Sequence, residues 1–251
     1  MKKVTFIAIT TLIILLPAFL FAANTIPIPK VTIGITQSAK PSDVSNTLQI
    51  LLLLTILTLA PSIMIMMTSF TRIIIVLHFL RQALGTQQMP PSQILIGLSL
   101  FLTFFVMSPV IKDINNNALQ PYLAEKITQK QALINAVKPL RKFMLKQTKK
   151  KDLALFVSLA KDRKKPKNIK EISTLTIIPA FITSELKTAF EMGFLIYIPF
   201  LVLDMVVASV LLSMGMMMLP PVMVSLPFKI ILFVLADGWN LLISSLIKSF
   251  Y

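Results

Sequence analysis

The sequence contains no cysteine, and only one histidine and six glycines among its 251 residues. Without cysteine the chain can form no disulfide scaffold, no thiolate metal site and no cysteine nucleophile. One histidine cannot build a zinc site of several histidines, and the few glycines do not spell a dinucleotide-binding loop or a P-loop. We therefore expect a protein that is not an enzyme, with no catalytic residue, no metal and no cofactor.

Charged residues are also scarce, at 14% of the chain, whereas 55% of residues are hydrophobic and the mean hydropathy is +0.81. A soluble domain carries roughly 25% charged residues, so the composition indicates a membrane protein. The charges that are present are mostly basic, with 25 Lys and Arg against 10 Asp and Glu. Because the Lys-rich stretch has no interleaved aromatic residues, we expect no nucleic-acid partner.

The N-terminus has the order of a secretory signal peptide: two lysines, an uncharged run and then Ala22 and Ala23. We assign residues 1–23 to a cleaved signal peptide. The alternative is an uncleaved signal anchor, because Leu20 and Phe21 are bulky where the cleavage pattern prefers a small residue. Residues 24–45 contain three prolines among Thr, Ser and Lys, which is typical of an extended linker.

Two uncharged runs, residues 48–67 and 92–111, each match the length of a membrane-spanning helix. A third apolar region, between Glu191 and Lys229, is too long for a single span. We divide it around Gly215 and the two prolines that follow, because glycine relaxes the backbone and proline cannot continue a helix. The division predicts a third span ending near Met214 and a fourth from near Val222 to about Ile247.

The sequence thus predicts an all-α integral membrane protein with four hydrophobic helices and a helical periplasmic insert between the second and third. Residues 46–111 form the first helical hairpin, residues 112–185 the insert, and residues 186–251 the second hairpin. In the insert, helical spacing places Phe143 and Phe156 each on an apolar face. Those faces pack either within one subunit or against a neighbouring copy.

Two rules disagree about the side of the membrane on which the insert lies. A cleaved signal peptide places the insert in the periplasm, whereas the positive-inside rule would keep its lysines in the cytoplasm. We follow the signal peptide, because long loops cross the membrane largely regardless of their charge. We interpret residues 69–91, which carry Arg72 and Arg81 and no acid, as a short cytoplasmic loop.

Several blocks of sequence, in this order, carry a resemblance to a known family: residues 69–91, 140–148, 183–190, 214–221, 226–229 and 236–239. They resemble the FliP family of flagellar type III export-gate proteins, and the resemblance covers about residues 46–251. The injectisome counterparts of this family share much of the pattern.

The resemblance implies a homo-oligomeric pore subunit in the bacterial inner membrane, at the flagellar basal body. It implies a channel built from several copies together with FliQ-like and FliR-like small membrane subunits, beside FlhA and FlhB. Unfolded flagellar proteins would be the export substrates that pass through it.

Four methionines cluster at the predicted turn between the third and fourth spans. Methionine is flexible and polarizable, so a ring of such side chains could seal a pore and still admit varied polypeptides. The alternative is that they only fill space in the core or face lipid. The predicted pore seal consists of Met214, Met216, Met217 and Met218.

Charges within the apolar regions form a second group, because each is costly in a membrane unless it is paired or lies in a wet cavity. The group consists of Asp204, Lys229 and Asp237. Asp204 and Lys229 either pair across the second hairpin or act separately, with Lys229 reaching the membrane interface. Such charges also occur in transporters and channels, but four spans without an internal repeat disfavour that class. The predicted subunit contacts are Phe143, Phe156 and Glu185.

Overall fold

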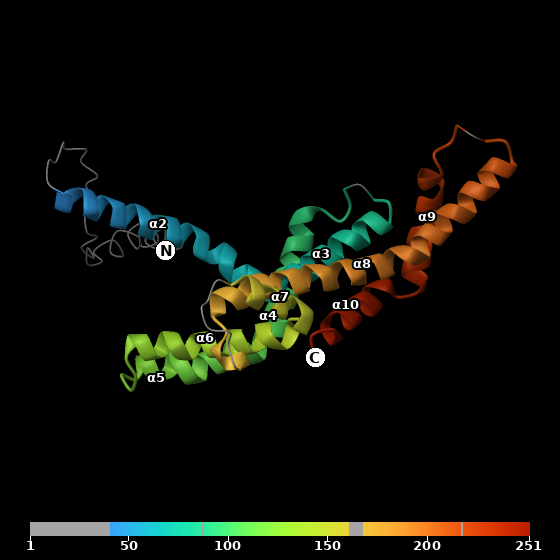
Figure 1. Ribbon diagram of the computed structural model, residues 1–251. Coiled ribbons are helices and arrows are strands. Elements are labelled where there is room, and N and C mark those ends of the chain that lie inside the picture. The colour runs from blue at the N-terminus through green and yellow to red at the C-terminus, as the bar shows by residue number, and fades with distance from the viewer. Residues whose placement is uncertain (1–40, 87, 161–167, 217) are drawn as a thin grey trace, which may run out of the picture. The chain divides into compact units, whose positions relative to one another are not determined.

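The computed structural model describes residues 41–86, 88–160, 168–216 and 218–251, and within these ranges every regular element is helical (Figure 1). The predicted signal peptide lies outside the described residues. So does the predicted linker, apart from residues 41–45, which begin helix α2 (Pro41–Met66). The chain divides into two compact units between Leu52 and Leu53, within α2.

Three described helices are long and apolar enough to cross a membrane, judged by length and composition. They cover Leu48–Met66, Ser92–Leu123 and Thr174–Ser213, and so include the first three predicted spans. The side chains of α2 from Leu48 to Met66 are almost all exposed in the isolated chain. Burying so much apolar surface in a bilayer removes the cost of exposing it to water.

The predicted fourth span is broken in the structure. Helix α9 (Pro221–Leu235) and helix α10 (Gly238–Lys248) are bent by 66° relative to each other. The bend is at Asp237, which has a left-handed backbone conformation with φ of 48°. The described part of the chain therefore contains three candidate spans, or four if the bent pair counts as one.

The interpretation of residues 69–91 as a short loop is wrong, because Phe70–Ala83 forms helix α3. The helix packs along α8 (Thr174–Ser213) and against α4 (Ser92–Ile114). Gly193 of α8 allows the close approach, since a Cβ atom at that position would lie 2.4 Å from the Phe79 ring. The residues that α3 buries are Arg72, Ile73, Val76, Leu77, Leu80 and Ala83.

The residues of the predicted insert are helical in the structure, as predicted. Helix α4 continues through a π-helical turn, η1 (Asn115–Leu119), into the short α5 (Gln120–Leu123). Helix α6 (Gln129–Gln147) then runs back beside η1 and α4, and α7 (Lys150–Leu159) packs on α8. A short 3-10 turn, η2 (Ile169–Glu171), precedes α8.

The apolar faces of α6 and α7 both pack on the first turns of α8. Met144 of α6, together with Ile177 and Phe181 of α8, is completely buried. Leu153 and Val157 of α7 pack against the same cluster. Of the two alternatives for these faces, packing within one subunit therefore accounts for much of their apolar surface.

Candidate functional site

A buried ion pair joins α3 to α8. The Arg72 side chain donates from Nε to Glu185 Oε2 over 2.9 Å, and from Nη2 to the other carboxylate oxygen. This two-point geometry is the strong form of an arginine–carboxylate contact, because two parallel hydrogen bonds fix the orientation of both groups. Glu185, a predicted subunit contact, is thus enclosed by its own chain.

Arg72 also holds the C-terminal residues against the core. Its Nη1 donates to the Ser249 carbonyl over 3.0 Å, and its Cζ lies 4.0 Å from the centre of the Phe250 ring. Gln147 at the end of α6 accepts from Arg72 over 3.2 Å and donates to the Phe250 carbonyl over 2.7 Å. One guanidinium therefore connects α3, α6, α8 and the C-terminus.

The two predicted contact phenylalanines have different surroundings. Phe143 is half-buried in the core of the chain, with its ring centre 5.9 Å from that of Phe181 and 6.4 Å from that of Phe250. Phe156 on α7 is also half-buried, but it forms no aromatic pair among the described residues. Phe143 thus stabilises the single chain, whereas part of the Phe156 ring stays available on its surface.

A second, partly buried ion pair lies in the second hairpin. Lys229 Nζ of α9 is 2.6 Å from Asp204 Oδ2 of α8, and the two side chains are 2% and 23% exposed. Ser225, one turn before Lys229, donates to the other carboxylate oxygen of Asp204. The structure therefore shows the two predicted membrane charges paired with each other rather than acting separately.

The same lysine reaches the end of α3. Lys229 Nζ donates to the Ala83 carbonyl over 3.2 Å, at the C-terminus of that helix. A cation at a helix C-terminus is favourable because the last carbonyls are unpaired and carry partial negative charge. Lys229 therefore connects three helices, α3, α8 and α9, at one point.

The predicted seal residues lie on the connection between α8 and α9. Gly215 ends α8 with a left-handed φ of 75°, a conformation that favours glycine. Met214 is 66% exposed and Met218 is 97% exposed, while Met216 is half-buried. Met217 lies outside the described residues.

The remaining charges in this part of the chain have local roles. Asp237 is exposed at the bend between α9 and α10, and it accepts a hydrogen bond from the Asn240 amide over 3.1 Å.

On α3, Arg81 donates to His78 Nδ1 over 3.1 Å. Burial and, secondarily, the charge of Arg81 lower the pKa of His78 below its usual value.

Sequence reasoning missed four residues of these clusters: Arg72, Gln147, Ser225 and Ser249. Their partners are distant in the sequence, so no spacing rule points to them. Ser225 had the clearest signal, because it lies four positions before Lys229 and helical residues at that spacing share a face.

Comparisons with known proteins all identify the same family. Residues 53–246 match the model of the FliP family. The chain is 58% identical over 218 residues to the flagellar biosynthetic protein FliP of Bacillus subtilis, covering 87% of this chain and 98% of the relative. It is 49% identical over 241 residues to the protein of the same name from Aquifex aeolicus, covering 96% of this chain and 98% of that one. The protein of the same name from Pectobacterium carotovorum is 54% identical over 219 residues, covering 86% of this chain and 84% of that protein.

Proposed function

The chain belongs to the FliP family of flagellar biosynthetic proteins, and we propose that it is a core subunit of the flagellar type III export gate. In this proposal several copies assemble with FliQ-like and FliR-like subunits, beside FlhA and FlhB, into a channel in the inner membrane. The channel passes unfolded flagellar proteins during flagellum assembly, and the protein itself performs no catalysis.

The observation that carries the proposal is the exposed methionine turn. Exposed apolar side chains that lie close together, such as Met214 and Met218, mark surfaces that a partner covers. Here they lie on the turn at Gly215, between the apolar helices α8 and α9. Repeated around a ring of subunits, Met214, Met216, Met217 and Met218 would form a flexible apolar constriction. The Asp204–Lys229 pair supports this role, because it fixes the two helices that present the turn.

Subunit contacts are proposed for the face of the insert that carries Phe156. Phe143 and Glu185 contribute to that contact indirectly. Phe143 holds α6 on α8 and Glu185 holds α3 on α8, so both residues set the shape of the insert. The long exposed apolar faces of α4 and α8 are further candidates for contacts with other membrane subunits or lipid.

The proposed topology keeps residues 1–23 as a signal peptide, residues 24–45 as a linker and the insert in the periplasm. Alkaline phosphatase is active only outside the cytoplasm, so a fusion near Lys150 should be active and a fusion near Gln87 inactive. The opposite pattern would place the insert in the cytoplasm, as the positive-inside rule requires.

Purification in a mild detergent tests the function directly. We expect a ring-sized assembly that contains several copies of this chain and small hydrophobic partner subunits. A monomer or dimer that transports a small solute after reconstitution would contradict the export gate and support a transporter instead.

A further inference from the structure

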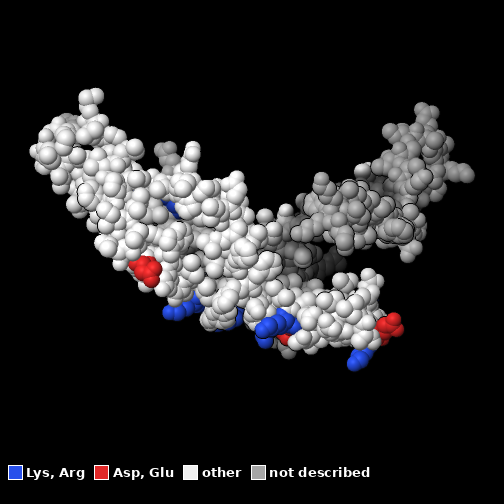
Figure 2. Space-filling model, turned by 180° about the vertical axis from the view of Figure 1, so that it is seen from behind, with Lys and Arg blue, Asp and Glu red and all other residues white. Residues whose placement is uncertain are grey.

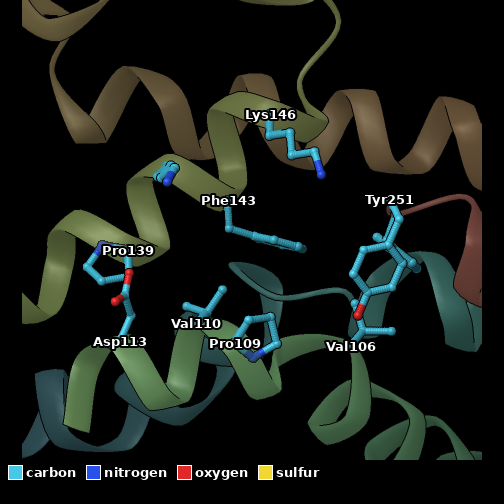
Figure 3. A pocket seen from close by; sticks show the side chains of 10 residues that line it. Val106, Pro109, Val110, Asp113, Pro139, Phe143, Lys146 and Tyr251 are labelled. Atoms are coloured by element: carbon cyan, nitrogen blue, oxygen red, sulfur yellow. The ribbon is translucent and has the colours of Figure 1, made fainter. Parts of the chain in front are cut away.

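A cavity of about 190 Å³ lies between α4, α6 and the C-terminal residues. Its α4 wall is apolar and includes Val106 and Val110. Figure 3 shows the Phe143 ring extending from α6 above this wall, with Lys146 reaching toward Tyr251 at one end. Because a cavity of about 150 Å³ holds a benzene ring, this one has room for one large apolar side chain.

A second, more polar hollow of about 370 Å³ adjoins the first, and Asp113, Pro139 and Lys142 line both of them. It extends along α6 to Asn135 and Lys138. We call the two hollows together the α4–α6 groove. The groove is therefore apolar at one end and polar at the other.

Three lysines, Lys138, Lys142 and Lys146, line this groove at intervals of four residues on α6. Residues four apart lie on the same face of a helix, so the three side chains form a row along about 12 Å of α6. None of them belongs to an ion pair among the described residues. Figure 2 shows basic side chains along the edge formed by the insert helices, whereas the helices above are almost free of charge.

The single acid that lines the groove does not neutralise the row. Asp113 accepts a hydrogen bond from the Asn117 amide over 3.1 Å and makes no ion pair within the described ranges. The groove thus keeps an excess of positive charge beside an apolar wall. Its complement is a surface that carries both acidic and apolar side chains.

A second copy of this chain does not offer such a surface. Its ten Asp and Glu residues are scattered, and the two that lie closest in the sequence, Glu185 and Glu191, are six positions apart. Glu185 is buried against Arg72, and Glu191 pairs with Lys149. No stretch of this chain therefore matches three lysines in a row, and the complement belongs to a different polypeptide.

The spacing of the lysines indicates the conformation of that polypeptide. Carboxylates four residues apart on a helix repeat at the same interval along the axis as lysines four apart on α6. A helix also satisfies its own backbone hydrogen bonds, whereas an extended segment would leave backbone groups unpaired against the apolar wall. An amphipathic helix laid into an apolar groove is a common mode of peptide recognition.

We propose that the α4–α6 groove is the docking site of an acidic amphipathic helix of a partner protein. Carboxylates four residues apart on that helix pair with Lys138, Lys142 and Lys146, and a large apolar side chain of the same helix enters the cavity beside Val110 and Phe143. This inference goes beyond the proposed export function, and it holds on whichever side of the membrane the insert lies.

The first test measures binding of a synthetic peptide to the purified full chain in detergent by fluorescence anisotropy. The probe is an alanine-rich helix with three glutamates at intervals of four and a phenylalanine on the adjoining face. A peptide of the same composition in scrambled order is the control. Three ion pairs and one buried ring predict about tenfold or more tighter binding of the patterned peptide. Equal binding of the two peptides would overturn the proposal.

Matched variants separate the groove from the general basic charge of the insert. Lys142→Gln with Lys146→Gln should weaken binding of the patterned peptide about threefold or more. Lys150→Gln with Lys151→Gln changes the charge equally at exposed positions on α7 outside the groove, and should weaken it by less than about twofold. Equal losses in the two double variants would show nonspecific attraction and contradict a defined site.

A second peptide shows whether the lysines and the carboxylates meet directly. With glutamine in place of the three glutamates, the peptide should bind more weakly, and the Lys142→Gln, Lys146→Gln variant should bind it no more weakly than the wild-type chain does. A further loss with the glutamine peptide would contradict direct pairing.

Another variant predicts a gain. Asp113→Asn removes the negative charge from the groove and keeps a side-chain oxygen for the Asn117 amide, so the patterned peptide should bind several-fold more tightly. Unchanged or weaker binding by Asp113→Asn would contradict the placement of the carboxylates in the groove. Because Asp113, Lys142 and Lys146 are all exposed, we expect each variant to fold.

Photocrosslinking in cells identifies the occupant itself. Tyr251 lines the groove and is 70% exposed, so a photoreactive p-benzoylphenylalanine in its place keeps an aromatic ring beside the bound segment. Sequencing of the crosslinked peptide should show a different polypeptide with acidic residues four positions apart. A crosslink to a second copy of this chain, to a segment without such acids, or to nothing would overturn the proposal.

Discussion

Arg72 and Glu185 lie 113 positions apart in the sequence, yet they form an ion pair whose side chains are 3% and 0% exposed. The pair explains why α3, which carries two arginines and a histidine, is a buried helix rather than a loop. It also anchors the C-terminus, because the same guanidinium binds Ser249 and lies over Phe250. The region around Arg72 is therefore the point on which the packing of α3 and α6 on α8 depends.

Replacing Glu185 by Ala should destabilise the chain strongly. The change leaves the Arg72 charge buried without its main partner, which typically costs about 3–5 kcal/mol. The expected result is a large loss of protein from the membrane fraction and a lower melting temperature in detergent. Glu191→Ala is the control, because Glu191 pairs with Lys149 at the surface and such pairs contribute about 0–1 kcal/mol. Equal effects of the two variants would contradict the proposed role of burial.

Phe143 and Phe156 should respond differently to replacement by Ala. Phe143→Ala removes contacts with Phe181 and Phe250 within the chain, so the free energy of unfolding should fall by up to about 3–5 kcal/mol. The amount of folded monomer should fall as a result. Phe156→Ala should leave the monomer at normal levels and reduce its assembly. Immunoblots of membranes and size-exclusion chromatography measure the two quantities. Loss of assembly with normal monomer in Phe143→Ala would show that this ring contacts a second subunit instead.

The Asp204–Lys229 pair predicts which substitution destabilises the chain more. Asp204→Asn leaves a charged Lys229 almost fully buried, whereas Lys229→Met leaves Asp204 with the Ser225 hydroxyl and some solvent. Asp204→Asn should therefore destabilise more, by about 3–5 kcal/mol, and the double variant should be more stable than Asp204→Asn alone. Thermal unfolding in detergent gives the ranking. A double variant that loses the sum of the two single effects would contradict a direct pair.

Gly193 should not tolerate a side chain. Gly193→Ala places a methyl group 2.4 Å from the Phe79 ring, so α3 must move away from α8. Gly97→Ala is the matched control, because Gly97 also lies within a helix and a methyl group there would meet no atom of the surrounding chain within 4 Å. We expect lower stability and export for Gly193→Ala, and unchanged or slightly higher stability for Gly97→Ala. Normal motility of cells with Gly193→Ala would contradict tight α3–α8 packing.

The apolar spans were predictable from the sequence because hydropathy and length alone define a membrane-spanning helix. Helix α3 was not predictable in this way, since Arg72 and His78 resemble the residues of a polar loop. The burial of Arg72 depends on Glu185, which lies far along the chain, and no local pattern reports such a partner. The bend at Asp237 did have a local signal, because Asp-Gly pairs mark turns even within an apolar run.

Part of the candidate site could also be predicted. Asp204 and Lys229 lie at similar distances from a turn marked by glycine and proline, so a hairpin brings them close together. The contact of Lys229 with Ala83 was not predictable, because it requires the position of α3. The difference between Phe143 and Phe156 likewise depends on the path of the C-terminus, which places Phe250 beside only one of them.

The methionine seal is the central claim, and ion conductance of the assembled gate tests it most directly. Met214→Ala with Met218→Ala shortens, in every copy, the two methionines of the turn that are exposed within the described residues. Met205→Ala with Met223→Ala is the control, because these methionines are 61% and 69% exposed but lie within α8 and α9. We predict that gates with the turn variant assemble normally and leak ions across a planar bilayer, whereas control gates stay closed. A normally assembled turn variant that conducts no more than the control would contradict the seal.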